Sequence, residues 1–113
     1  MNNVWNYRDS TWTDGHDLAG YDVEATDGSI GNVDQATNDV SNAHVVVDTG
    51  FWIFGKKRLI PAGAISSVEH GDKKIHVQMT KEQIKDAPDY EAESWDDNTR
   101  ARHDEYYSSY STF

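Results

Sequence analysis

Hydrophobic residues in the middle of the chain come in short runs that are separated by turn residues. Near the end of this region Ile75, Val77 and Met79 alternate with polar residues, which is the pattern of a strand with one buried face. Residues 43–49 form a β-branched run, and the Asp-Gly pair ending at Gly28 is typical of a tight hairpin turn. About six short strands at this spacing predict a small barrel or a pair of curled sheets.

Two local signals refine this prediction. The hydrophobic positions on either side of Gly31 have opposite parity, so we expect a bulge in the strand that contains this glycine. Thr80 is followed three residues later by Gln83, which is a capping-box pattern for the start of a helix. Because Pro88 stops this segment, we predict a helix of only one or two turns that closes the barrel.

The two ends of the chain are polar with isolated aromatic residues. We divide the chain into an N-terminal aromatic arm at residues 1–17, a barrel domain at residues 18–90 and an acidic aromatic tail at residues 91–113. Ser94 and Asp97 are candidate caps for a second helix in the tail. On that helix Tyr106, Tyr110 and Phe113 would form one stripe. The sequence leaves open whether the stripe packs on its own domain, binds a partner or belongs to a disordered tail.

One apolar run, at residues 51–54, stands apart from the strands because it lies between two glycines and is followed by cations. Strand alternation buries only two of four consecutive side chains on one face. Each large side chain left in water forgoes about 1.5–3 kcal/mol. The run is therefore covered by the chain's own aromatic arms or by another molecule, unless it is a loop that tolerates exposure. We predict an interface made of Phe51, Trp52, Ile53, Phe54, Lys56, Lys57, Tyr106 and Tyr110.

The 113 residues carry a formal net charge of −10 at pH 7, and the charges are segregated along the chain. Nine acidic residues and no lysine or arginine lie between positions 9 and 48, whereas seven of the ten basic residues lie between positions 56 and 85. Phosphate contacts require lysine and arginine, so we predict no nucleic-acid partner. An acidic face can steer a basic protein, and the segregation suits pairing with a second copy. The alternative is that the charges only keep the protein soluble.

Several kinds of chemistry lack their sequence signals. The chain has no cysteine, no apolar stretch near the roughly 20 residues of a membrane span, and no secretory leader pattern. We therefore expect a soluble, cytoplasmic protein without membrane insertion. The five histidines lack metal-ligand spacing, and no calcium loop, nucleophile elbow or phosphate-binding loop occurs. We predict no catalytic residue, no metal, no cofactor and no enzymatic activity.

Several short motifs occur in a specific order along the barrel region. They are LAGYDV at 18–23, DGSIGNV at 27–33, VVVDTG at 45–50, LIP at 59–61 and TKEQIKDAP at 80–88. With the segments VWNYRD and WIFGK and an aromatic tail, this set resembles the PRC-barrel domain family, in particular its small stand-alone actinobacterial proteins. The resemblance implies a six-stranded open β-barrel that is used for docking, often as a dimer, with no catalytic residues to carry over.

We therefore predict an all-β fold, a small six-stranded open PRC-type barrel with a short C-terminal helix and aromatic N- and C-terminal extensions. Its predicted function is a non-enzymatic docking or assembly module that forms a homodimer and binds an unidentified basic protein. One alternative is a ribosome- or RNA-processing accessory that docks on a basic protein, because the PRC-barrel domain also forms part of a ribosome maturation factor. The other alternative is a sensor of a small molecule or a metal.

Overall fold

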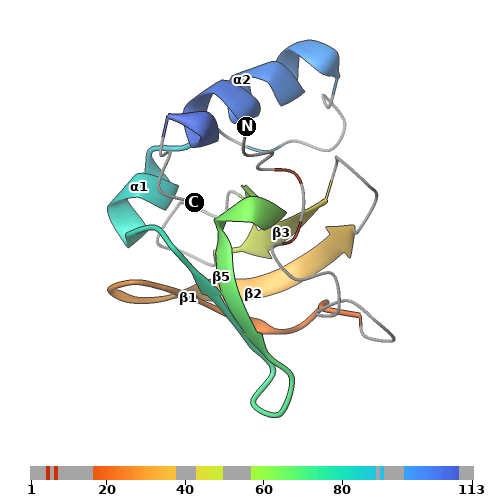
Figure 1. Ribbon diagram of the computed structural model, residues 1–113, viewed down its shortest axis with the longest axis vertical. Coiled ribbons are helices and arrows are strands. Elements are labelled where there is room, and N and C mark those ends of the chain that lie inside the picture. The colour runs from red at the N-terminus through yellow and green to blue at the C-terminus, as the bar shows by residue number, and fades with distance from the viewer. Residues whose placement is uncertain are drawn as a thin grey trace.

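The computed structural model describes residues 5, 7, 17–37, 43–49, 57–88, 90 and 96–109. They form the strands β1 (Asp22–Ala25), β2 (Gly28–Thr37), β3 (His44–Asp48), β4 (Lys57–Pro61), β5 (Ile65–Glu69) and β6 (Lys74–Val77), the short 3-10 turn η2 (Ala62–Ala64) and the helices α1 (Lys81–Lys85) and α2 (Asp97–Ser108). The strands build one sheet in the order β4-β3-β2-β1-β6-β5. All neighbours are antiparallel except β1 and β6. The described chain is thus an all-β open barrel (Figure 1). Strands β4 and β5 are the two edges of its sheet.

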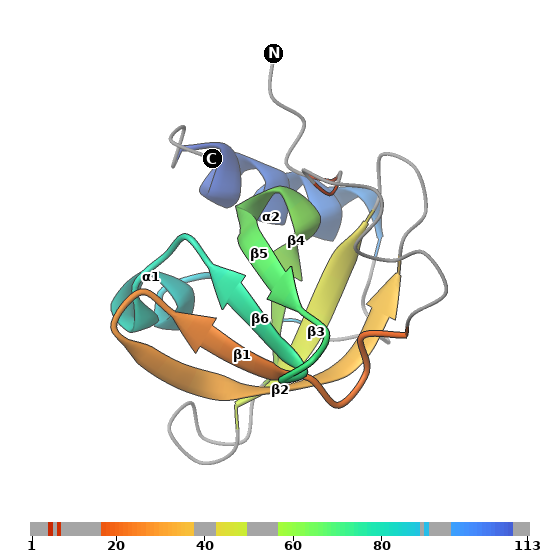
Figure 2. The same cartoon turned by 60° about the horizontal axis from the view of Figure 1, so that its bottom comes forward.

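The long strand β2 curls beneath the rest of the barrel because two bulges bend it (Figure 2). At the first bulge the register against β1 shifts and leaves Ile30 as the extra residue. Gly31 beside it has a φ of 146°, and a Cβ atom at this position would lie 2.0 Å from the carbonyl oxygen of Asp48. Only glycine allows β2 and β3 to approach so closely here. The predicted bulge near Gly31 is confirmed.

Aliphatic side chains fill the interior of the barrel. In β6, Ile75 and Val77 are buried whereas Lys74 and His76 are partly exposed, which confirms the predicted alternation. Met79 continues the buried face beyond the strand. The same cluster takes side chains from all six strands and from both helices, so one core holds every described element of the barrel together.

Helix α1 begins with the predicted capping box. The hydroxyl oxygen of Thr80 accepts from the backbone N–H of Gln83 at 3.2 Å, and the side-chain oxygen of Gln83 accepts from the backbone N–H of Thr80 at 2.9 Å. At the other end, the guanidinium of Arg58 from β4 donates to the carbonyl oxygens of Ile84 at 3.2 Å and Lys85 at 2.9 Å. A cation fits there because the last carbonyls of a helix lack helical partners and carry partial negative charge.

Helix α2 lies across one end of the barrel, opposite the turn between β5 and β6 (Figure 1). The second helix expected in the tail is therefore present, but its cap is neither Ser94 nor Asp97. The side chain of Asp96 accepts from the backbone N–H of Thr99 at 2.8 Å, and Asp97 is the first helical residue. Asp96 can cap because its backbone is extended, as an N-cap requires.

The buried stripe of α2 consists of Thr99, His103 and Tyr107, which are spaced by four residues. Tyr107 is fully buried, whereas Tyr106 is only partly buried against the core. The stripe that we expected to include Tyr106 therefore runs through the next residue, Tyr107. The other two members of the expected stripe, Tyr110 and Phe113, lie outside the described residues.

Candidate docking surface

Only two residues of the predicted interface, Lys57 and Tyr106, lie in the described part of the chain. Outside it are Phe51, Trp52, Ile53, Phe54, Lys56 and Tyr110. The segment that contains the apolar run joins β3 to β4, and the ends of these strands, Asp48 and Lys57, are paired directly across the sheet. Lys57 therefore marks where the chain re-enters the barrel after the run.

Lys57 has an acidic partner within its own chain. Its ammonium donates to the carboxylate of Asp34 on β2 at 2.7 Å. The hydrogen bond to Asp34, followed by the charge of the same group, holds the pKa of Lys57 above its usual value. Both side chains remain about 40% exposed, at 43% and 39%, so solvent screens the pair. The basic and acidic parts of the chain meet here intramolecularly.

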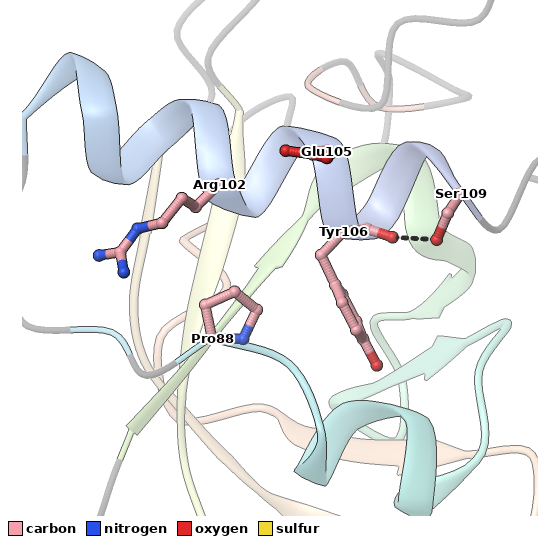
Figure 3. Close-up of a pocket in the computed structure, with 5 residues that line it drawn as sticks. All are labelled: Pro88, Arg102, Glu105, Tyr106 and Ser109. Carbon is pink, nitrogen blue, oxygen red and sulfur yellow. Dashed lines mark hydrogen bonds between the residues drawn. The ribbon is translucent and has the colours of Figure 1, made fainter.

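Tyr106 lies between the two helices. Its hydroxyl donates to the carbonyl oxygen of Gln83 in α1, and its ring hangs from α2 toward α1 (Figure 3). Beside it is an open pocket of about 410 Å³ lined by Pro88, Arg102, Glu105, Tyr106 and Ser109. The two opposite charges on its rim, Arg102 and Glu105, give this pocket no net preference for a charged ligand.

Trp5, one of the described residues of the N-terminal arm, packs against α2. The indole N–H of Trp5 donates to the carboxylate of Asp104 at 2.7 Å, and the guanidinium of Arg100 lies 4.7 Å from the centre of the indole ring. Trp5 also meets His44 edge to face and clusters with Leu59. We call Trp5 together with α2 the outer layer, because both pack against β4 without being part of the sheet.

Tyr7 brings a second part of the N-terminal arm to the barrel. Its ring is partly buried against the main core, and its hydroxyl oxygen is shielded from solvent with no hydrogen-bond partner among the described residues. Burial raises the pKa of Tyr7 to about 12, because the charged phenolate is poorly solvated there.

Tyr90 and the outer layer together cover one edge of the sheet. The carbonyl oxygen of Lys57 accepts from the backbone N–H of Tyr90 at 3.4 Å, and that of Leu59 accepts from the hydroxyl of Tyr107. The next residue that faces outward in β4 is Pro61, which has no N–H to offer. Two outward carbonyls are thus occupied and one outward donor is missing, which makes this edge less open to a partner strand.

The opposite edge, β5, is protected in another way. This strand has five residues, and its register against β6 shifts between Ile65 and Ser67. A short, bulged edge is a poor template for another strand. Within the part of the chain that the structure describes, the sheet therefore favours contacts through side chains over strand addition.

His103 is the titratable group at the centre of the outer layer. Its ring is 0% exposed, and Nδ1–H donates to the carbonyl oxygen of Thr99 one turn earlier at 2.8 Å. Burial lowers the pKa of His103, and the cations Arg102 and Arg58 lower it further, against the opposing effect of the Thr99 and Pro88 carbonyls. A neutral ring is therefore favoured in this position near neutral pH.

Sequence reasoning missed the outer layer because its key residues are polar or far apart along the chain. Trp5 and Asp104 are separated by 99 positions, and no local pattern connects them. The spacing of Thr99, His103 and Tyr107 could have indicated a helix face, but a stripe with threonine and histidine does not register as hydrophobic.

The described residues also bear on metals and membranes. No group of three or more histidine, aspartate or glutamate side chains among them is arranged to hold a metal ion. Within the same residues, neither helix is long and apolar enough to cross a bilayer.

Comparisons with known proteins show a likeness to a solved structure. No protein-family model matches the chain, and no curated protein matches it. Among solved structures, the chain is similar to a Pseudomonas aeruginosa protein named as a 16S ribosomal RNA processing protein, RimM, with a TM-score of 0.48 and 20% sequence identity. The match covers 57% of this chain and 42% of that protein, so the matched part spans less than half the length of RimM.

This finding contradicts one prediction made from the sequence. The net charge led us to exclude a nucleic-acid partner, whereas the matched protein is named for the processing of a ribosomal RNA. The exclusion is therefore wrong as an inference from net charge. The physical reason is that phosphate contacts depend on where cations lie, and the described chain places cations such as Lys73 at exposed positions despite its acidic total.

Proposed function

We propose that the chain is a non-enzymatic docking module, and that the apolar run at residues 51–54 is its contact with a second copy of the chain. A two-fold contact joins the same patch of two subunits, so each copy covers the run of the other. Burying large apolar side chains is the main source of affinity in such contacts. The segregated charges of residues 9–48 and 56–85 give the two copies complementary surfaces.

The observation that supports this proposal most is the position of the aromatic side chains that could have covered the run. Trp5 is 2% exposed, and its ring is surrounded by contacts with β3, β4 and α2. Tyr107 is buried against β4, and Tyr106 is bound to α1. These contacts engage Trp5, Tyr106 and Tyr107, while other aromatic residues of the two arms, such as Trp12 and Phe113, lie outside the described residues.

The state of the sheet edges supports a contact through side chains. β4 is closed by Tyr90, Tyr107 and Pro61, and β5 is short and bulged. A partner protein should therefore bind through side-chain contacts rather than by adding a strand to the sheet through backbone hydrogen bonds. Four consecutive large apolar residues between two glycines are the strongest such feature of the sequence.

Substitution of Trp52 tests the proposal. At about 100 µM, roughly a hundredfold above the dissociation constant of a micromolar dimer, light scattering should give the mass of a dimer. Trp52→Ala should weaken self-association by about 2 kcal/mol, or 30-fold, and leave the circular dichroism spectrum unchanged. The control is Trp5→Ala, which removes a ring buried within one chain. It should lower the melting temperature and leave the dimer intact.

Three results would contradict the proposal. A monomer at this concentration would remove the second copy as partner. A Trp52→Ala chain that melts earlier but assembles normally would show that the chain covers its own run. A monomer that binds ribosomal RNA would favour the RNA-processing alternative instead.

A further inference from the structure

The attachment of α2 to the barrel depends on few apolar atoms. The helix contains no leucine, isoleucine, valine, methionine or phenylalanine. Its buried stripe combines one aromatic residue, Tyr107, with Thr99 and His103. Among the described residues, other attachments of α2 are polar: hydrogen bonds of Tyr106 to α1, Tyr107 to Leu59 and Trp5 to Asp104, and the contact of Arg100 with the Trp5 ring. Elements with little buried apolar area open locally more easily than the core does.

His103 occupies the centre of this attachment. It lies one helical turn from Thr99 on one side and one turn from Tyr107 on the other, and its ring is fully enclosed. A proton added to the ring would place a positive charge in that enclosed position, where water cannot solvate it. The charge could be solvated only if the helix moved away.

The surroundings of the ring decide whether the protein could stabilise that charge. Among the described residues, the charged groups that act on it are two cations, Arg58 from β4 and Arg102 from α2. The segment after α1 contributes the carbonyl of Pro88, and α2 contributes the carbonyl of Thr99. The nearest carboxylate along the helix, that of Asp104, accepts the hydrogen bond from Trp5. Two carbonyl dipoles thus favour the protonated ring of His103, whereas two positive charges and the loss of water disfavour it. The net effect is to disfavour the protonated ring.

We propose that α2 is an acid-sensitive cover over the edge of β4, which is released when His103 takes up a proton. Release withdraws the Tyr107 hydroxyl from the Leu59 carbonyl and breaks the bond between Asp104 and Trp5. Both hydrogen bonds hold the outer layer against β4 when α2 is in place. The proposal does not depend on the apolar run, because every residue in it lies in the outer layer, on β4 or, in the case of Pro88, in the segment after α1.

The direction of the pH dependence follows from the site. Burial lowers the pKa of His103 in the closed state, while in the open state it returns to about 6.5. Above that value both states hold a neutral ring, and the closed state keeps its full stability. As the pH falls through 6.5 toward the lowered pKa, the open state binds more protons and closure weakens. Between pH 7.5 and 5.5 the opening equilibrium rises by up to about tenfold.

Hydrogen exchange followed by mass spectrometry tests this directly. After correction for the intrinsic pH dependence of exchange, the peptide that covers α2 should lose up to about tenfold in protection between pH 7.5 and 5.5. Peptides of the core strands β2 and β6 should keep theirs. His103→Asn, which retains a side-chain N–H but cannot be charged, should abolish the pH dependence. His76→Asn is the matched control, because His76 lies on the partly exposed face of β6 beside Glu69.

Each other outcome would overturn the proposal. Equal loss of protection in α2 and in the core strands would show global unfolding rather than release of a cover. An unchanged pH dependence in His103→Asn would assign the effect to another group. If that variant does not fold, imidazole NMR of the wild-type chain replaces it, and His103 must then titrate with the same midpoint as the exchange of α2.

Discussion

The barrel interior and the outer layer are held by different kinds of side chain. In the interior, residues such as Val45, Ile65 and Ile75 are 0% exposed, and their side chains make apolar contacts with their neighbours. In the outer layer, Trp5 and Tyr107 are buried just as fully, but each also uses a polar atom to bind a specific partner. Apolar burial is non-directional, whereas a hydrogen bond depends on the position of single atoms.

This difference predicts how the two regions respond to change. Burial contributes roughly 25 cal/mol for each Å² of apolar surface removed from water. Every buried apolar side chain of the interior therefore adds to the free energy of unfolding. Each polar contact of the outer layer contributes a net of only about 1 kcal/mol. The outer layer should therefore respond to single atoms and to protonation, while the interior responds to changes of volume and backbone shape.

The largest effect is expected at Gly31, where the backbones of β2 and β3 meet. Gly31→Ala places a methyl group 2.0 Å from the carbonyl oxygen of Asp48 and forces alanine into a φ of 146°. We expect a loss of about 3 kcal/mol or more in the free energy of unfolding, measured with urea. The control is Gly20→Ala, because Gly20 has a φ of 87° but nothing within 4 Å of the added Cβ atom. It should cost only the strain of the left-handed backbone, about 1 kcal/mol.

Equal costs for the two glycine substitutions would contradict this account. They would mean that backbone strain dominates at both positions and that the close approach of β2 to β3 relaxes freely. The interior would then be less rigid than its packing indicates.

The two regions also differ in how well the sequence predicts them. The barrel was predictable because its strands follow local rules: alternation in β6, a glycine at the bulge of β2 and the capping box of α1 each involve residues close in sequence. The outer layer depends on pairs such as Trp5 with Asp104, which only the finished fold brings together. Of the predicted interface, Lys57 and Tyr106 proved to have partners in their own chain, in Asp34 and Gln83. Their role toward another molecule stays a prediction.

A smaller effect is expected at Tyr107, which links the two regions. Tyr107→Phe keeps the ring in the core cluster but removes the hydroxyl that donates to the carbonyl oxygen of Leu59. We expect a loss of about 1 kcal/mol in the free energy of unfolding and faster hydrogen exchange in α2. Tyr106→Phe is the matched control, since it removes a hydroxyl from a partly exposed ring on the same helix. A larger loss for Tyr106→Phe than for Tyr107→Phe would place the main attachment of α2 at α1 rather than at β4.

The smallest effect is expected for the pair of Lys57 and Asp34, which belongs to neither region. Asp34→Asn removes the carboxylate that holds the pKa of Lys57 above its usual value. Because both side chains are about 40% exposed, water and salt replace most of what the pair contributes. The urea midpoint at neutral pH should therefore match that of the wild-type chain, and added salt should not separate the two. If Asp34→Asn instead destabilises the chain more than Tyr107→Phe does, a solvent-exposed ion pair would outweigh a buried hydrogen bond. The contrast between a robust interior, a sensitive outer layer and a neutral surface would then fail.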